Sequence, residues 1–373
     1  MKVLYLGHYR ELGGWSQAAR DYMLAMDSVG IDVVCRNIRL THKNSDVPTK
    51  IAQMESKNLD DCDVCIQHVL PHYLIGTKQF KKNIAYFVSE SVSIKPTPWF
   101  IHLRQMDEVW VPNHSLRNGL VQDGLMSEDR ISVVPHAFDL KKYSKKYKPI
   151  SIDNANSKFK FYYVGDLNDR KNLPSLIRSF HSEFDRSEPV ALILKVWKFG
   201  LSPQAAHAAV VELCSRVKTE MRLYASEDSY HREIIIADFI DDEGISSIHQ
   251  YSDCFVCPSH GEAWSIPSFD AMCFGKTPIC SDCGGPKDFI GTDQSVGSLV
   301  SGTNAICNCS DSAFPHIFTG REEWLQPSEG EIKKSMRYYY ENRDKIDRTA
   351  GLKRGKDFSY EKIGNQIKEL LEA

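Results

Sequence analysis

The sequence predicts an α/β protein built from two doubly wound parallel sheets. Short apolar runs, rich in β-branched and aromatic residues, alternate with amphipathic helical stretches along both halves of the chain. Such runs suit strands that are buried on both faces, so the alternation indicates parallel sheets with helices on either side. The length of 373 residues also favours two domains, because a single hydrophobic core rarely grows beyond about 250–300 residues.

The expected strands fall into two sets. In the first half they are VLYLG, DVVCRNI, DVCIQHV, NIAYFVS, EVWVPN and ISVVPHAF. In the second half they are FKFYYVG, LILKVW, EIIIADF, CFVCPS and TPICS. Two helices between them show an apolar face, formed by Trp15, Ala19, Met23 and Met26 in one and by Leu173, Leu176, Ile177 and Phe180 in the other.

A polar stretch from Asp139 to Lys158 is the candidate linker between the halves. We therefore expect a first Rossmann-like domain over residues 1–150 and a second over residues 151–355. The remaining residues, 356–373, end in an amphipathic run that predicts a helix able to dock on either half.

The composition is that of a globular protein, with 42% hydrophobic and 25% charged residues. No apolar run approaches the roughly 18–20 residues that a transmembrane helix needs. The start of the chain, MKVLYLG, leads into a polar glycine turn, which indicates a first strand and not a signal peptide. We expect a cytoplasmic protein, with peripheral membrane contact left open.

Residues 1–150 carry a small excess of Lys and Arg, gathered in KKYSKKYK from Lys141 to Lys148. A run of this kind is usually a solvated face, and it also favours an anionic acceptor or surface. Nucleic acid as a partner is neither indicated nor excluded.

Eleven cysteines raise the question of a metal site. Three pairs have C-x-x-C spacing, at Cys62/Cys65, Cys254/Cys257 and Cys280/Cys283. The first two pairs lie inside strand runs, where side chains three residues apart point to opposite faces. Only the third pair, at a strand exit, could act as a ligand or redox pair, and we expect no metal site.

The most informative stretch runs from Pro258 to Ile290. It predicts a strand end, a loop carrying Glu262, and a short helix opened by Pro267 with Asp270 in its first turn. Both carboxylates then lie at the carboxyl edge of a parallel sheet beside a helix N-terminus, where open α/β sheets bind ligands. Carboxylates accept hydrogen bonds from sugar hydroxyls and helix N-termini favour phosphate, so the pattern indicates a nucleotide-sugar.

This stretch resembles the E-x7-E signature of retaining glycosyltransferases of the GT-B fold, family 4. The residues that match are Glu262, Trp264, Pro267, Ala271, Met272 and Gly275. Asp270 stands where the family has its second Glu, and Ala263 and Ser265 replace two glycines. The first change shortens an acid by one methylene, and the others narrow the loop or relax its need for unusual backbone angles.

The resemblance implies two Rossmann-like domains that face each other across a cleft, with the C-terminal helix returning to the first. It also implies that Glu262 is catalytic and holds the hydroxyls of the transferred sugar. Asp270 would bind the nucleotide ribose, and Ser265 and Ile266 would contact the donor. No cofactor or divalent metal is implied, and the donor would be a UDP- or GDP-sugar.

Two loops are similar to the family's donor-diphosphate loops. Gly13 and Gly14 stand at the first strand–helix junction, where glycine lets the backbone approach a ligand. Arg170 and Lys171 stand just before a helix, and two cations with a helix dipole suit a diphosphate. Many family members carry a further Arg where this chain has Asp166.

The first half supplies two further candidates for catalysis. His68 ends the third strand and matches a family position beside the reaction centre, with His72 as its competitor. Glu90 follows the fourth strand and is similar to an acid that contacts the acceptor, although a capping acid on the surface fits the same position.

The sequence therefore indicates a retaining glycosyltransferase that moves a sugar from a nucleotide-sugar to an acceptor hydroxyl. The acceptor could be a glycan, a lipid-linked glycan or a modified DNA base. Two alternatives stay open: a degenerate relative that binds a nucleotide-sugar or partner without turnover, and a nucleotide-sugar epimerase.

Overall fold

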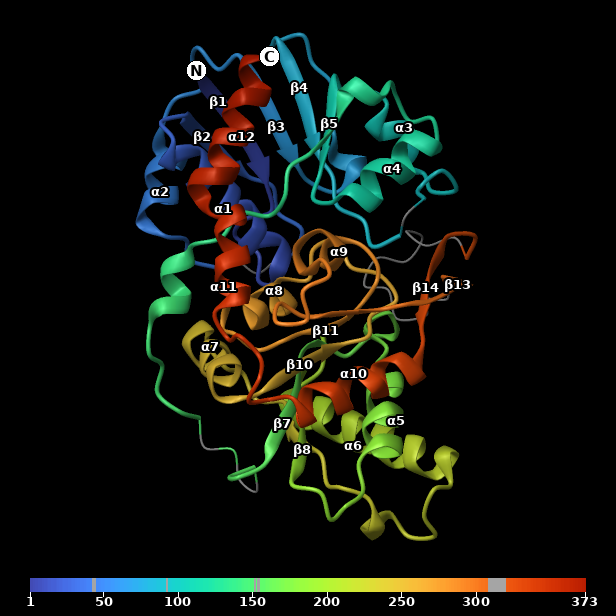
Figure 1. Ribbon diagram of the computed structural model, residues 1–373. Helices are drawn as coiled ribbons and strands as arrows, with labels where there is room; N and C mark the ends of the chain where they lie inside the picture. Colours follow the sequence, from blue (N-terminus) through green and yellow to red (C-terminus); the bar gives the residue numbers. More distant parts are fainter. Residues whose placement is uncertain (42–44, 92, 151, 153–154, 308–319) are drawn as a thin grey trace. The chain divides into compact units, whose positions relative to one another are not determined.

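A computed structural model describes residues 1–41, 45–91, 93–150, 152, 155–307 and 320–373 (Figure 1). The chain divides into two compact units. Unit 1 comprises Met1–Lys142 and Lys356–Ala373, and unit 2 comprises Tyr143–Gly355. The first unit therefore ends at Lys142, eight residues before the boundary that we expected at residue 150.

Unit 1 is built on a six-stranded parallel sheet in the order β2-β1-β3-β4-β5-β6. Its strands are β1 (Lys2–Gly7), β2 (Asp32–Asn37), β3 (Val64–His68), β4 (Lys82–Tyr86), β5 (Glu108–Val111) and β6 (Ile131–Val133). Its helices are α1 (Gly14–Ser28), α2 (Thr49–Ser56), α3 (Trp99–Leu103), α4 (His114–Gln122) and α12 (Tyr360–Glu372). All six strand runs expected in this half are strands.

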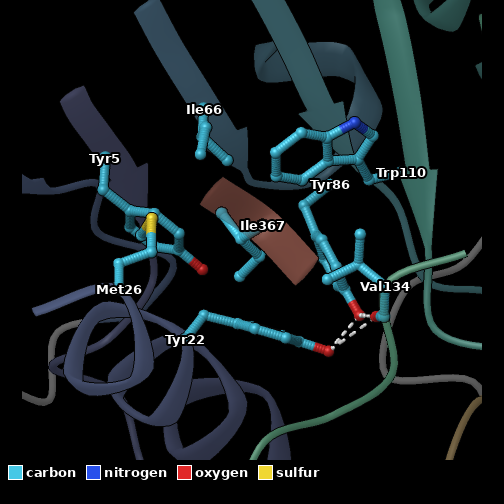
Figure 2. A pocket seen from close by; sticks show the side chains of 8 residues that line it. All are labelled: Tyr5, Tyr22, Met26, Ile66, Tyr86, Trp110, Val134 and Ile367. Carbon is cyan, nitrogen blue, oxygen red and sulfur yellow. Dashed lines mark hydrogen bonds between the residues drawn. The ribbon is translucent and has the colours of Figure 1, made fainter. Parts of the chain in front are cut away.

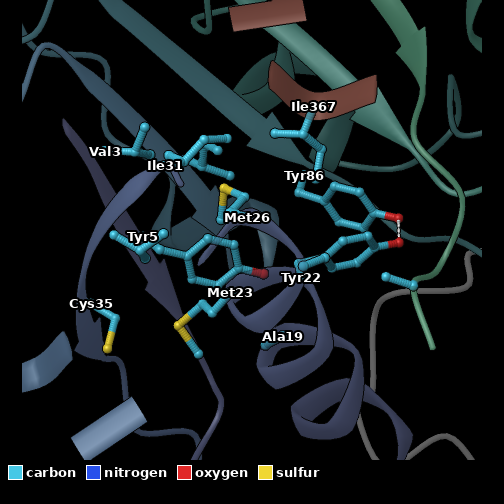
Figure 3. Close-up of a cluster of buried hydrophobic side chains, with 14 of the residues drawn as sticks. Val3, Tyr5, Ala19, Tyr22, Met23, Met26, Ile31, Cys35, Tyr86 and Ile367 are labelled. Carbon is cyan, nitrogen blue, oxygen red and sulfur yellow. Dashed lines mark hydrogen bonds between the residues drawn. The ribbon is translucent and has the colours of Figure 1, made fainter. Parts of the chain in front are cut away.

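The C-terminal helix α12 packs against α1 in the core of unit 1. Gly364 lies so close to α1 that an added Cβ would come within 2.3 Å of the Ala25 carbonyl oxygen. Apolar residues of α12, including Ile367, join the buried cluster of α1 and the sheet (Figure 3). Tyr360 at the start of α12 donates a hydrogen bond of 2.5 Å to the buried Asp21. Residues more than 330 positions apart therefore share one core.

Unit 2 contains a second six-stranded parallel sheet, in the order β12-β11-β10-β7-β8-β9. Its strands are β7 (Phe159–Asp166), β8 (Val190–Trp197), β9 (Ile234–Ile236), β10 (Cys254–Cys257), β11 (Ile279–Ser281) and β12 (Ser298–Val300). Its helices are α5 (Leu173–Glu183), α6 (Pro203–Met221), α7 (Asp242–Tyr251), α8 (Ile266–Cys273), α9 (Gly285–Ile290), α10 (Glu329–Glu341) and α11 (Ala350–Gly355). A separate antiparallel pair joins β13 (Gly302–Ile306) to β14 (Glu323–Pro327).

The expected α/β class with two doubly wound parallel sheets is confirmed. Three strands of unit 2, β12 to β14, were not expected. The ten cysteines in the described part of the chain are free thiols, most of them buried. Among the described residues, no group of His, Cys, Asp and Glu side chains could hold a metal ion. No helix in that same part of the chain is long and apolar enough to cross a membrane.

Candidate functional site

The carboxyl edge of the unit 2 sheet brings together two loops that lie far apart in the sequence. Arg170 and Lys171 belong to a 3-10 turn, Asp169–Lys171, between β7 and α5. Glu262 belongs to the loop between β10 and α8. Because β7 and β10 are parallel neighbours, both loops leave the sheet at the same edge.

Glu262 is held by an ion cluster at this edge. Lys171 Nζ lies 2.6 Å and Arg170 Nη1 lies 3.3 Å from the same carboxylate oxygen, Oε1. Ser259 donates a further hydrogen bond of 2.5 Å to Oε1. Arg170 also donates to the main-chain oxygen of Gly261 at 2.6 Å, so that one guanidinium fixes both the loop and its acid.

The contacts of this cluster use one of the two Glu262 carboxylate oxygens. All of these contacts fall on Oε1, and Oε2 has no hydrogen-bonding partner among the described residues. Burial alone would raise the pKa of Glu262, but the charges of Lys171 and Arg170 and the bonds from Lys171 and Ser259 lower that pKa to about 2. Glu262 is therefore an ionised acceptor at neutral pH.

Two glycines after β11 allow a second loop to press against the Glu262 loop. Gly284 has a positive φ of +59°, and a Cβ added there would lie 1.6 Å from the Glu262 carbonyl oxygen. A Cβ at Gly285 would lie 2.5 Å from the Trp264 Cα. The backbone around Glu262 is thus supported by a contact that only glycine permits.

Asn168 connects the cationic turn to Asp166, a link that our sequence interpretation missed. Its Oδ1 accepts the Lys171 N–H at 3.1 Å, and its Nδ2 donates to Asp166 Oδ2 at 2.8 Å. The other oxygen, Asp166 Oδ1, is buried without a partner among the described residues. Burial raises the pKa of Asp166, although Asn168 and the nearby cations oppose the shift. The N-x-x-K spacing of an N-cap was the available signal for Asn168.

The loop before α8 differs from two expectations. Ser265 keeps a left-handed backbone with φ +68°, so replacing the family's glycine does not relax the unusual angle. The helix begins at Ile266, which places Asp270 in its second turn and not its first. The amides of residues 268 and 269 bond to the Ser265 carbonyl, and Pro267 has no N–H. In this first turn, the N–H of Ile266 has no partner among the described residues.

Asp270 is almost fully buried and is hydrogen-bonded within unit 2. Tyr143 donates a hydrogen bond of 2.6 Å to Asp270 Oδ1, and the exposed fractions are 7% for Tyr143 and 4% for Asp270. Sequence reasoning assigned Asp270 to the donor but did not anticipate Tyr143.

In unit 1, several N–H groups and ring nitrogens without partners among the described residues lie where β1 and β3 end. Gly13 caps α1 with φ +103°, and the amides of residues 14–16 have no partner among the described residues. The side chain of His68 is fully buried, with Nδ1 2.8 Å from the Tyr5 hydroxyl. Its Nε2 and the Trp15 Nε1 both lack a partner in the described chain, and the two rings lie 5.8 Å apart. Burial, with the charges of His8 and His136, lowers the pKa of His68, so its imidazole is neutral.

The surroundings of His68 are aromatic and closely packed. Tyr22 and Tyr86 contact the imidazole. Their hydroxyls bond to each other and to the Val134 carbonyl oxygen (Figure 2). A cavity beside these two tyrosines, which His68 does not line, measures only about 10 Å³ and is too small for a substrate. His72 is exposed on the 3-10 turn Pro71–Tyr73, and Glu90 is half-buried in the loop after β4. Of the two histidines, His68 is therefore the one built into the core at a strand end.

Comparison with known proteins finds a family match within the second unit and a shared fold over the whole chain. Residues 146–306 match the family model described as Glycosyl transferases group 1. No curated protein sequence shows a significant match to the chain. The matched residues lie within unit 2 and include Arg170, Lys171 and Glu262.

Solved structures show the same architecture at low sequence identity. HepE of Anabaena, in complex with UDP-glucose, has 15% identity and a TM-score of 0.69, covering 100% of this chain and 99% of that one. Sucrose-phosphate synthase of Thermosynechococcus elongatus has 14% identity and a TM-score of 0.64, covering 100% and 98%. A trehalose-6-phosphate synthase, described in terms of glycosyl transfer with retention, has 9% identity and a TM-score of 0.65, covering 99% and 98%. These similarities confirm the expected GT-B fold.

Proposed function

Residues 146–306 form a glycosyl transferases group 1 domain on a GT-B fold, and from this premise we propose that the chain is a retaining glycosyltransferase with a nucleotide-sugar donor. The observation that carries the proposal is the state of Glu262. Its charge is fixed through Oε1 by Lys171 and Arg170, while Oε2 keeps its acceptor capacity. An ionised acceptor beside two cations suits a substrate that joins sugar hydroxyls to a diphosphate.

In this proposal Lys171 and Arg170 stabilise the diphosphate as it leaves and gains charge. An ammonium group has three N–H donors, so Lys171 can bind Glu262 and a phosphate oxygen together. Glu262 Oε2 accepts a hydroxyl of the transferred sugar and stabilises the ring as positive charge develops. Asp270, Ser265 and Ile266 contact the nucleotide side of the donor.

Unit 1 contributes the α1 N-terminus and His68 in the same scheme. The amides that follow Gly13 can donate to an anion, and Gly14 leaves the helix end open to it. The neutral His68 can use Nε2 toward a sugar or acceptor hydroxyl, with its tautomer set by the bond to Tyr5. Glu90 is the proposed acceptor contact, and the leaving phosphate takes the acceptor proton, as the family resemblance implies.

The donor we favour is a UDP-sugar, with a GDP-sugar second, because HepE shares the fold and is described in complex with UDP-glucose. The acceptor class stays open among glycans, lipid-linked glycans and modified DNA bases. We expect the reaction to survive EDTA, since cationic side chains neutralise the leaving group. A cytoplasmic location remains a prediction.

One observation favours a second candidate, a binding protein without turnover. Asp166 places an acid near Lys171 and Arg170, where many relatives have a further Arg, and this acid opposes an anion. A slow or absent reaction with intact donor binding would fit such a protein.

A panel of UDP-, GDP- and ADP-sugars tests the proposal. One donor should raise the melting temperature by mass action and release its nucleoside diphosphate slowly even to water. Lys171→Ala should weaken that binding about ten-fold or more, because it removes a charge-assisted contact. Arg178→Ala, which breaks the half-exposed pair with Glu329, is the matched control and should bind normally. Absence of binding by every donor would contradict the proposal, and binding without release would favour the second candidate.

A further inference from the structure

Tyr143 makes a buried contact with the acid that we assign to the donor ribose. The Tyr143 hydroxyl donates to Asp270 Oδ1 at 2.6 Å across 127 residues of sequence. Its ring packs edge-on against Phe274, with centroids 5.1 Å apart and planes at 82°. Phe274 is the C-cap of α8 and lies four residues after Asp270, so α8 and its C-cap provide both the acceptor for the hydroxyl and the surface for the ring.

The segment that carries Tyr143 is itself fixed to unit 2. Gln250 of α7 donates to the Lys145 carbonyl at 2.9 Å and accepts the Tyr147 N–H at 2.9 Å. Tyr251 donates to the Tyr147 carbonyl at 3.0 Å, and Ser247 donates to the Lys148 carbonyl at 2.6 Å. Because the backbone after Tyr143 is held at several points, the hydroxyl reaches Asp270 from a defined position.

The hydrogen bond from Tyr143 holds the short side chain of Asp270 in one conformation. Aspartate reaches one methylene less far than the glutamate usual in the family, and a carboxylate can accept several hydrogen bonds at once. A carboxylate held in one rotamer loses less conformational freedom when it accepts ligand hydroxyls.

Resting on the proposed function, we propose that Tyr143 is a positioning residue that orients Asp270 to accept the ribose hydroxyls of the donor nucleotide. Tyr143 does not touch the reacting atoms. Its removal should therefore weaken binding only of ligands that carry the ribose hydroxyls, and should leave the diphosphate contacts as they are.

Calorimetry with UDP and 2′,3′-dideoxy-UDP tests this assignment, with GDP and its dideoxy form if the wild type prefers guanine. Tyr143→Phe keeps the ring on Phe274 and should weaken UDP binding about ten-fold, the loss expected for one charge-assisted contact. The same variant should bind dideoxy-UDP as the wild type does. Tyr339→Phe, which removes another buried hydroxyl of unit 2 bonded to Ser298, is the control and should bind both ligands normally.

The outcomes separate the inference from the function on which it rests. Equal weakening of UDP and dideoxy-UDP would show that Tyr143 acts only on the stability of the loop, and would overturn the inference. Unchanged or tighter UDP binding by Tyr143→Phe would also overturn the inference. Tyr143 would then have no effect on the ribose contact, or its hydroxyl would occupy the acceptor that the ribose hydroxyls need. Failure of the wild type to bind any nucleotide would contradict the proposed function and, with it, the inference.

Discussion

Lys171 Nζ lies 2.6 Å from Glu262 Oε1, and this ion pair is buried, with 12% and 7% of the two side chains exposed. The pair joins the turn after β7 to the loop after β10, two segments 91 residues apart. It also decides the charge of the acid at the proposed donor site.

The pair should show strong coupling between its two members. Lys171→Met leaves Glu262 buried with Arg170 as its remaining cation, and should lower the free energy of unfolding by about 3 kcal/mol. Adding Glu262→Gln removes the uncompensated charge, so the double variant should be more stable than Lys171→Met alone. Urea denaturation of the wild type, the two single variants Lys171→Met and Glu262→Gln, and the double variant measures this coupling. Strictly additive losses of unfolding free energy would show that the two residues are not coupled.

Ionisation of Glu262 should contribute to the pH dependence of the free energy of unfolding. Its pKa in the folded protein is about 2, below the 4.5 of an unperturbed Glu, so its ionised form favours folding. This contribution, roughly 3 kcal/mol from the pKa difference, is fully present above about pH 5 and is lost as the pH falls toward 2. The difference in unfolding free energy between wild type and Glu262→Gln should therefore shrink between pH 5 and pH 2. A constant difference would contradict the low pKa.

Asp166 should weaken anion binding at the donor site. Its burial raises its pKa, and its remaining negative charge at neutral pH opposes a diphosphate beside Lys171. Asp166→Asn keeps the shape and the Asn168 neighbour, and should tighten binding of a nucleoside diphosphate about two- to five-fold. Weaker binding in a calorimetric titration would instead make Asp166 a direct ligand contact.

Backbone strain at Ser265 should appear in a comparison of two substitutions. Both Ser265→Gly and Ser265→Ala remove the 2.7 Å hydroxyl contact with Ser268. Only glycine adopts the left-handed φ of +68° without cost, so the glycine variant should be more stable than the alanine variant by about 1 kcal/mol. Thermal unfolding in parallel measures this, and an alanine variant of equal or higher stability would mean that the loop relaxes when substituted.

The sequence predicted the buried strands because each is a short, continuous apolar run. It missed β13, since the residues of Gly302–Ile306 are mostly exposed and show no apolar alternation. The charge and position of Glu262, Arg170 and Lys171 could be read from local motifs. Contacts between distant segments could not be predicted from local motifs. No spacing rule connects Tyr143 to Asp270 or fixes which carboxylate oxygen of Glu262 faces the cations. The left-handed angle at Ser265 also escaped prediction, because support from neighbouring loops overrode the local preference of serine.

We propose that Glu262 acts on the transferred sugar while Lys171 and Arg170 hold the diphosphate. The most direct test measures Glu262→Gln with a donor that the wild type turns over, following kcat for nucleoside diphosphate release and the Kd of that diphosphate. We expect kcat to fall about 100-fold or more and Kd to change far less, because the carboxylate charge matters most as the ring becomes cationic. An unchanged kcat, with donor and acceptor verified, would contradict it.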